Sequence, residues 1–164
     1  MTSETSTIPT TGVPQIDQQE AALLNDLLQL NLDSQNGYQT AADALQNKAY
    51  ADRFRQYGQE RKHNGDELTQ LLRSNGHTVS KAGTLSGLFH QGWLNLEALL
   101  AAGDAAILAE CERVDALTLS AYQDVMGKTT NEGILELLRR QFTRIRDAHD
   151  YSKTLRGALE QALR

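Results

Sequence analysis

The sequence has a single cysteine, two prolines, no long apolar run and no excess of basic residues among its 164 residues. Because Cys111 is the only cysteine, it cannot form a disulfide within the chain, and the polar start Met1-Thr2-Ser3-Glu4 lacks the cationic and apolar regions of a secretory signal. Both features indicate a reducing, cytoplasmic setting. No apolar stretch approaches the roughly 18 residues that span a bilayer, so we predict no membrane segment.

The charge balance and the prolines narrow the class of protein further. A formal net charge of -5 leaves no basic field for DNA or RNA, which argues against nucleic-acid binding. Both prolines, Pro9 and Pro14, lie in the first fourteen residues, so no proline interrupts long helices downstream. The length suits one domain that buries its own core without disulfides or structural metal.

Apolar residues recur at steps of three and four along most of the chain, the spacing of amphipathic helices. Capping boxes at Asp17 with Glu20 and at Thr129 with Glu132 mark two helix starts, and Asp104 is the expected cap of a third. No strand pattern is present. The predicted long helices cover about 17–45, 49–73, 104–127 and 129–159, and a shorter amphipathic helix covers about 85–100.

The connections between these helices predict the architecture. The break at 46–48 is short enough to fold the first two helices back antiparallel, and a crossover of about 74–104 leads to a second hairpin. The Ser- and Thr-rich residues 1–15 show no apolar period and are predicted to form a disordered tail before a domain of residues 16–164. The predicted fold class is all-α, a ferritin-like four-helix bundle of two antiparallel hairpins with a long crossover.

Several short motifs occur in a characteristic order and spacing between about residues 20 and 158. They are Leu24-Asn25-Asp26-Leu27, Asp33 with Tyr38, Glu67-Leu68, Leu88-Phe89-His90-Gln91-Gly92-Trp93, Glu110-Cys111-Glu112-Arg113, Tyr122 and His149-Asp150. Together they resemble an uncharacterised bacterial family, common in proteobacteria, of four-helix-bundle proteins assigned to the ferritin-like group. The resemblance implies the bundle fold and raises the question of a metal, but it implies no biochemical role.

One spacing in the second helix matches a metal motif. Carboxylate-bridged dimetal sites in such bundles take a Glu from each of two helices and a Glu-x-x-His from each of the other two. Glu60-x-x-His63 has this spacing, whereas the last helix offers Arg146-x-x-His149, with a cation in place of the carboxylate. Across the second hairpin, a salt bridge from Glu112 to Arg146 is the simpler expectation. The candidate ligands, for iron or manganese, are Asp33, Glu60, His63, Glu112, Asp115 and His149.

Helical phase favours a different set of residues for the interior. The apolar stripe of the second helix passes through Arg61 and turns Glu60 and His63 toward its flanks, where a solvated face or an interface is expected. Buried charges need partners, so Arg61 is expected to pair with Asp33 or Asp115, and His149 with an acid of the third long helix. The predicted buried polar network is Arg61, Glu112, Asp115 and His149.

Three hypotheses on function follow from these patterns. The first is a structural or interaction protein with a degenerate metal site, which forms a homodimer or higher homo-oligomer. The second is an iron- or manganese-binding protein of stress physiology, and the third is an adaptor that recruits a partner through residues 1–15. No spacing predicts catalytic residues, so an enzyme is not favoured. The predicted interaction face of the homo-oligomer is Leu88, Phe89, Trp93 and Leu96.

Overall fold

Residues 12–79, 98 and 100–164 are described in the computed structural model, and within them the chain is helical with no strand. The long helices are α1 (Gln18–Ala44), α2 (Lys48–Ser74), α5 (Asp104–Lys128) and α6 (Glu132–Ala162), and a short 3-10 helix, η1 (Leu100–Ala102), precedes α5. The prediction of an all-α chain with four long helices is confirmed. Residues 85–97 and 99 of the predicted crossover helix lie outside the described residues, and with them its predicted face of Leu88, Phe89, Trp93 and Leu96.

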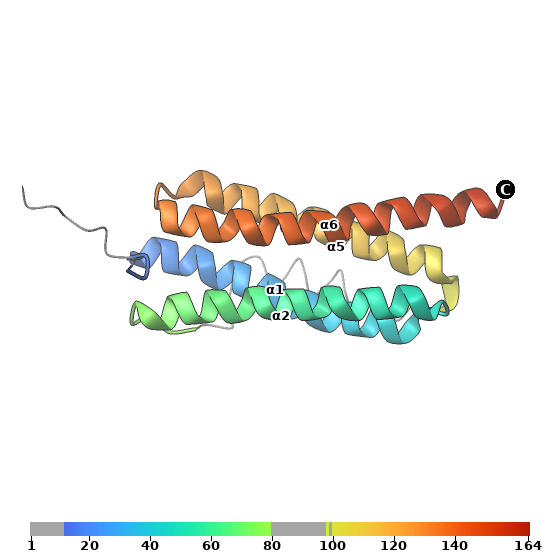
Figure 1. Ribbon diagram of the computed structural model, residues 1–164, viewed down its shortest axis with the longest axis horizontal. Coiled ribbons are helices and arrows are strands. Elements are labelled where there is room, and N and C mark those ends of the chain that lie inside the picture. The colour runs from blue at the N-terminus through green and yellow to red at the C-terminus, as the bar shows by residue number, and fades with distance from the viewer. Residues whose placement is uncertain (1–11, 80–97, 99) are drawn as a thin grey trace, which may run out of the picture.

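The helices form two antiparallel hairpins that lie side by side (Figure 1). Helix α1 folds back on α2, and α5 folds back on α6, because only three residues separate the helices of each hairpin, 45–47 and 129–131. The C-terminal end of α6 continues past the rest of the bundle (Figure 1). Within the described residues, no helix has the length and apolar content that crossing a membrane requires.

The start of α1 matches its sequence signal. The backbone N–H of Glu20 donates to Asp17 Oδ1 at 2.8 Å, and that of Asp17 donates to Glu20 Oε2 at 3.0 Å, which completes the predicted capping box. The prediction for α5 is wrong, because Gly103 is its N-cap and makes no side-chain cap bond. The Asp104 carboxylate instead accepts from the backbone N–H groups of residues 46 and 47, in the α1–α2 connection, at 3.0 and 3.4 Å.

The start of α6 also differs from the prediction. Asn131, not Thr129, is the N-cap, and its Oδ1 accepts from the backbone N–H groups of Gly133 and Ile134 at 3.1 and 3.3 Å. The Thr129 hydroxyl donates to the carboxylate of Glu20 at the start of α1, at 2.7 Å. The α5–α6 turn thus gives Thr129 a partner in the other hairpin, which a local capping pattern cannot show.

The residues just before α1 make hydrogen bonds to both hairpins. Asn75, at the end of α2, donates from Nδ2 to the carbonyl of Pro14 at 2.9 Å and accepts the backbone N–H of Ile16 at 3.1 Å. Asn131 donates to the carbonyl of Gln15 at 2.7 Å. The segment before α1 therefore ties both hairpins together at one end of the bundle, while residues 1–11 lie outside the described part of the chain.

The apolar core divides into two clusters along the bundle axis. The first cluster lies toward the N-terminal end of α1 and includes Leu24, Leu27, Leu28, Leu68, Leu72, Tyr122, Val125, Ile134, Leu138 and Ile145. The second cluster lies toward the C-terminal end of α1 and includes Tyr38, Ala41, Phe54, Tyr57, Ile107, Leu108, Cys111 and Ala148. Aromatic rings pack closely in the second cluster, with the ring centroids of Tyr38 and Phe54 5.4 Å apart.

We predict that Asn75→Ala lowers the free energy of unfolding by about 1–3 kcal/mol, because it removes the partner of two backbone groups of the segment before α1. Urea unfolding monitored by circular dichroism measures the loss. Asn36→Ala, at an exposed position of α1, is the control and is expected to be neutral or slightly stabilising. Equal effects of the two substitutions would contradict a holding role for Asn75.

Candidate functional site

Buried polar side chains gather between the two apolar clusters. On α1 and α2 they occupy the stretch of the helix that separates one cluster from the other. On α5 they lie between Val114 and Tyr122 of the first cluster, and α6 adds one residue near each cluster. We call this set the central polar layer. Its members are Asn31 and Ser34 of α1, Arg61 and Asn64 of α2, Asp115 and Thr118 of α5, and Gln141 and Ser152 of α6.

An ion pair between the hairpins lies at the centre of this layer. Arg61 donates from Nη2 to Asp115 Oδ1 at 2.8 Å, and the two side chains are 1% and 0% exposed. The Tyr38 hydroxyl donates to the other oxygen, Asp115 Oδ2, and the guanidinium carbon of Arg61 lies 5.7 Å from the centre of the Tyr38 ring. Both carboxylate oxygens of Asp115 are therefore engaged by protein donors from the first hairpin.

Burial controls the ionisation of the groups around this pair. It raises the pKa of Asp115, and the Arg61 charge and the Tyr38 hydrogen bond oppose that effect without cancelling it. Burial also raises the pKa of Tyr38, and the nearby Asp115 carboxylate adds to the rise. Cys111 behaves in the same way, because burial and the neighbouring carboxylates raise the pKa of its thiol. Cys111 is therefore a packed thiol without thiolate character.

A second network connects all four helices through Tyr122. Asn31 donates from Nδ2 to the Tyr122 hydroxyl oxygen at 2.7 Å, and that hydroxyl donates to Gln141 Oε1 at 2.8 Å. Asn64 donates to Asn31 Oδ1 at 3.2 Å, and Gln141 donates from Nε2 to the backbone carbonyl of Asn64 at 3.2 Å. Each amide thus has a partner on another helix, which fixes the heights of the four helices relative to one another.

This network reaches the surface between α2 and α6. Gln141 also donates to Glu67 Oε2 at 2.9 Å, and Arg144 donates to Asn64 Oδ1 at 2.9 Å and to Glu67 Oε2 at 3.2 Å. Partial burial by itself raises the pKa of Glu67, but the Gln141 hydrogen bond and the Arg144 charge together lower it. Glu67 is therefore a paired carboxylate that closes the network toward solvent.

The remaining candidate ligands of the first hairpin lie away from the ion pair. Asp33 and Glu60 are half-buried, and the His63 side chain is 60% exposed with its Nε2 3.5 Å from Glu67 Oε1. Burial raises the pKa of Glu60, while Arg61 and other cations oppose the rise. The spacing Glu60-x-x-His63 thus belongs to the flank of α2.

The second hairpin corrects one predicted partner. Glu112 accepts from Arg156 at 2.6 Å, not from Arg146, which is exposed. His149 lies half-buried with Nδ1 3.0 Å from the carboxylate of its neighbour Asp150, and it also interacts electrostatically with Asp115 of α5. Of the predicted network of Arg61, Glu112, Asp115 and His149, the structure joins only Arg61 and Asp115 directly, because an offset along α6 gives Glu112 a partner further along that helix.

The donor set of the interior does not fit a dimetal centre. Within the described residues, no group of three or more His, Cys, Asp or Glu side chains lies close enough to hold a metal ion. Asp115 is the acid of the central layer, and its oxygens already bind Tyr38 and Arg61. A guanidinium beside this carboxylate repels a cation electrostatically. The interior is arranged for hydrogen bonding between helices.

Three residues that no sequence pattern indicates also bond across helices. They are Asn31 and Asn64 of the central polar layer and Arg144, which lies at its surface end. The sequence does carry a signal at Ser34, which lies four residues from both Leu30 and Tyr38, and at Gln141, which lies three and four residues from Leu138 and Ile145. Polar residues on the inward faces of several helices at similar heights indicate a shared network, but their height depends on how the hairpins align.

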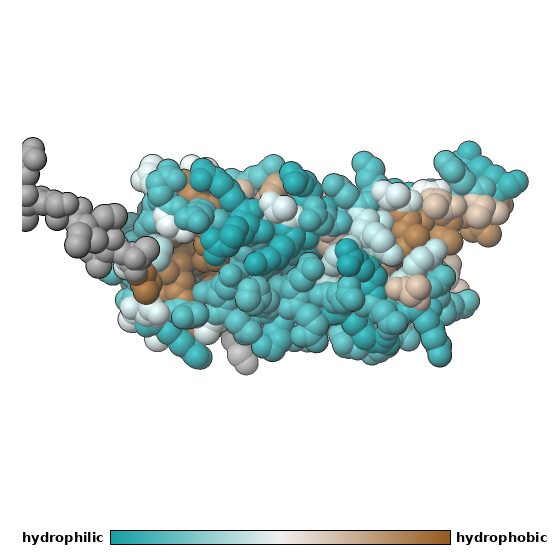
Figure 2. All heavy atoms as spheres, in the orientation of Figure 1, coloured by the Kyte–Doolittle hydropathy of each residue, from teal (hydrophilic) through white to brown (hydrophobic). Residues whose placement is uncertain are grey.

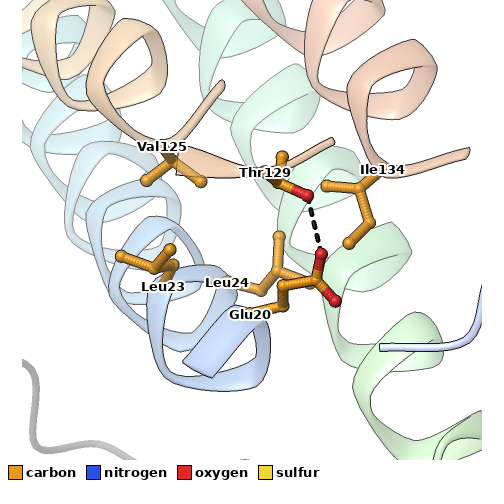
Figure 3. Close-up of a pocket in the computed structure, with 6 residues that line it drawn as sticks. All are labelled: Glu20, Leu23, Leu24, Val125, Thr129 and Ile134. Atoms are coloured by element: carbon orange, nitrogen blue, oxygen red, sulfur yellow. Dashed lines mark hydrogen bonds between the residues drawn. The ribbon is translucent and has the colours of Figure 1, made fainter. Parts of the chain in front are cut away.

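A shallow pocket between the start of α1 and the α5–α6 turn is not a ligand site. Figure 3 shows Glu20 and Thr129 joined by a hydrogen bond at its edge. The side chains leave no space that a water molecule could occupy. The pocket is lined by Glu20, Leu23, Leu24, Val125, Thr129 and Ile134.

The fold and the site define a four-helix bundle with a paired charge and an amide network in its core. A family model for a domain of unknown function, DUF2383, matches residues 19–128, and the chain belongs to this family. The match begins in α1 and ends with α5, so it includes the Arg61–Asp115 pair and Tyr122 but not Gln141 of α6. Comparisons with curated proteins and with solved structures found no match.

We predict that Arg61→Met destabilises the fold by about 3–5 kcal/mol at pH 7, because it leaves the Asp115 carboxylate buried without its counter-ion. Adding Asp115→Leu is expected to restore most of this loss. Urea unfolding measures both variants. Lys62→Met, which breaks an exposed pair with Asp66 on the same helix, is the control and is expected to cost no more than about 1 kcal/mol.

The same variant has an expected pH dependence. Removal of Arg61 raises the pKa of Asp115 further in the folded state, so it lies above the unfolded value of about 3.9. The folded state then binds more protons between these two values, and stability falls as the pH rises through that window. The loss of unfolding free energy that Arg61→Met causes should therefore be smaller at pH 4 than at pH 7. A loss of unfolding free energy that grows toward pH 4 would contradict the burial of an unpaired Asp115.

We predict that Tyr122→Phe costs about 1–3 kcal/mol, because the Asn31 amide and the Gln141 carbonyl each lose a buried partner. The ring itself is retained, so the apolar packing of the first cluster changes little. Thermal unfolding compares this variant with Tyr50→Phe, which removes a hydroxyl from a half-buried position at the start of α2. A loss as small as that of Tyr50→Phe would show that the Tyr122 hydroxyl does not hold the network together.

Proposed function

We propose that this protein is a ferritin-like bundle that acts through its surfaces, as a structural or interaction protein, and that its interior serves helix register in place of a dimetal centre. The observation that supports the proposal most strongly is the buried Arg61–Asp115 pair between the hairpins. A bundle that held two metal ions in its core would need several free carboxylates facing inward from all four helices.

The positions of the other acids support the same proposal. Glu112 accepts a charged hydrogen bond from Arg156, and Glu67 binds Arg144 and Gln141. These carboxylates have protein partners, so holding a cation would require those ion pairs to break. Glu60 and His63 lie at the flank of α2, where they suit a contact with solvent or with another protein.

Self-association is the second part of the proposal. The sequence predicts an apolar face of Leu88, Phe89, Trp93 and Leu96, and such a face suits a homodimer. The end of α6 adds an apolar surface, since Leu163 is 83% exposed and Figure 2 shows hydrophobic residues along this end of the bundle. An iron- or manganese-binding role for the same chain is the competing function.

Metal analysis separates the two functions. The full chain, produced in cells supplied with iron and manganese, is expected to carry far less than one metal ion per chain by inductively coupled plasma mass spectrometry. Retention of one or two ions per chain would overturn the proposal. A variant with Glu60→Ala and His63→Ala is the matched control, since loss of retained metal in that variant would assign it to the flank of α2.

Light scattering tests the self-association. The full chain is expected to elute as a dimer or larger species whose mass falls on dilution, and Trp93→Ala is expected to shift it toward the monomer. A monomer at all concentrations would overturn this part of the proposal while leaving the result of the metal analysis intact.

A further inference from the structure

Polar atoms of the central layer remain unsatisfied by the protein. Among the residues that the structure describes, four buried side-chain polar atoms have no hydrogen-bond partner, and they are Ser34 Oγ, Arg61 Nε, Arg61 Nη1 and Ser152 Oγ. Both serines are 0% exposed and Arg61 is 1% exposed. Buried polar groups are rarely left unpaired, since each loses its hydration on folding.

Helix register places these atoms at one height of the bundle. In the antiparallel α1–α2 hairpin, Asn64 bonds to Asn31, so Ser34, three residues after Asn31, lies level with Arg61, three residues before Asn64. The α5–α6 hairpin repeats this relation, because Glu112 bonds to Arg156, which brings Ser152 level with Asp115.

The Arg61–Asp115 ion pair then joins these two heights into one level. Each of the four helices contributes a polar side chain there.

The chemistry of the level selects its ligand. Arg61 and Asp115 neutralise each other, so a bound anion would add an uncompensated buried charge, and a cation would face the unpaired guanidinium N–H groups. The serine hydroxyls can donate and accept, whereas the guanidinium nitrogens only donate. The ligand must therefore be small, neutral and able both to accept and to donate hydrogen bonds.

We infer that this level of the bundle is an internal hydration site, in which ordered water molecules bind the free N–H groups of Arg61 and the hydroxyls of Ser34 and Ser152. Buried waters of this kind make about three hydrogen bonds each to groups that the protein leaves unpaired. These waters bind the guanidinium N–H groups that the single hydrogen bond to Asp115 leaves unpaired. The inference is independent of the proposed function, since water suits this level whatever the surfaces bind.

A crystal structure of the full chain, from crystals soaked in bromide, tests the site. The expected result is water density within hydrogen-bond distance of Arg61 Nε or Nη1 and of a serine hydroxyl, with no anomalous signal. A bromide peak at this level would overturn the inference and indicate an anion site. An iron or manganese peak would overturn it and indicate a metal site. Direct bonds from these atoms to protein groups, with no density between them, would also overturn it.

A solution experiment with matched variants checks the same site. Because the level is buried, its waters exchange slowly, and we expect a slow-exchanging component in the magnetic relaxation dispersion of solvent water. Ser34→Ala with Ser152→Ala should reduce the amplitude of this component, while Ser120→Ala, at an exposed position of α5, should leave it unchanged. An amplitude unaffected by the double substitution in a folded protein would contradict the assignment to this level.

Discussion

The buried ion pair between Arg61 and Asp115 is the constraint on which the rest of this structure depends. A guanidinium that is almost wholly removed from water is stable only if its charge is neutralised nearby, and the matching acid comes from the other hairpin. The pair therefore sets which faces of α2 and α5 turn inward and at what height they meet. Tyr38 of α1 completes the acid's hydrogen bonds, so a third helix is held to the same level.

The central polar layer gives the bundle specificity that its apolar clusters alone do not. Leucine-rich interiors tolerate sliding by a turn, because one apolar contact is much like the next, whereas a displaced amide or charge would lose its partner. The Tyr122 network opposes such sliding from Asn31 on α1 to Gln141 on α6, and it ends at the Glu67–Arg144 pair at the surface. Register and hairpin packing are thereby coupled across all four helices.

This arrangement also shapes the chemistry available to the protein. The Asp115 carboxylate and the inward-facing amides are bonded to protein groups, and the imidazole of His63 is largely exposed. Membership of the DUF2383 family, whose matched region ends with α5, places the ion pair inside the shared domain and leaves α6 to supply the last partners of the network. The function proposed for the chain therefore concerns its surfaces, and the interior serves to hold those surfaces in place.

The sequence by itself determined the four long helices, the capping box at Asp17 and the inward position of Arg61, because helical periodicity and capping are local properties of the chain. It narrowed the partner of Arg61 to two acids, of which the structure pairs it with Asp115. Only the tertiary structure decided that Glu112 bonds to Arg156, that Thr129 bonds to Glu20, and that Pro14 and Gln15 are held. Those contacts depend on the offset between helices and between hairpins, and a shift of one turn, which local spacing cannot detect, exchanges every partner.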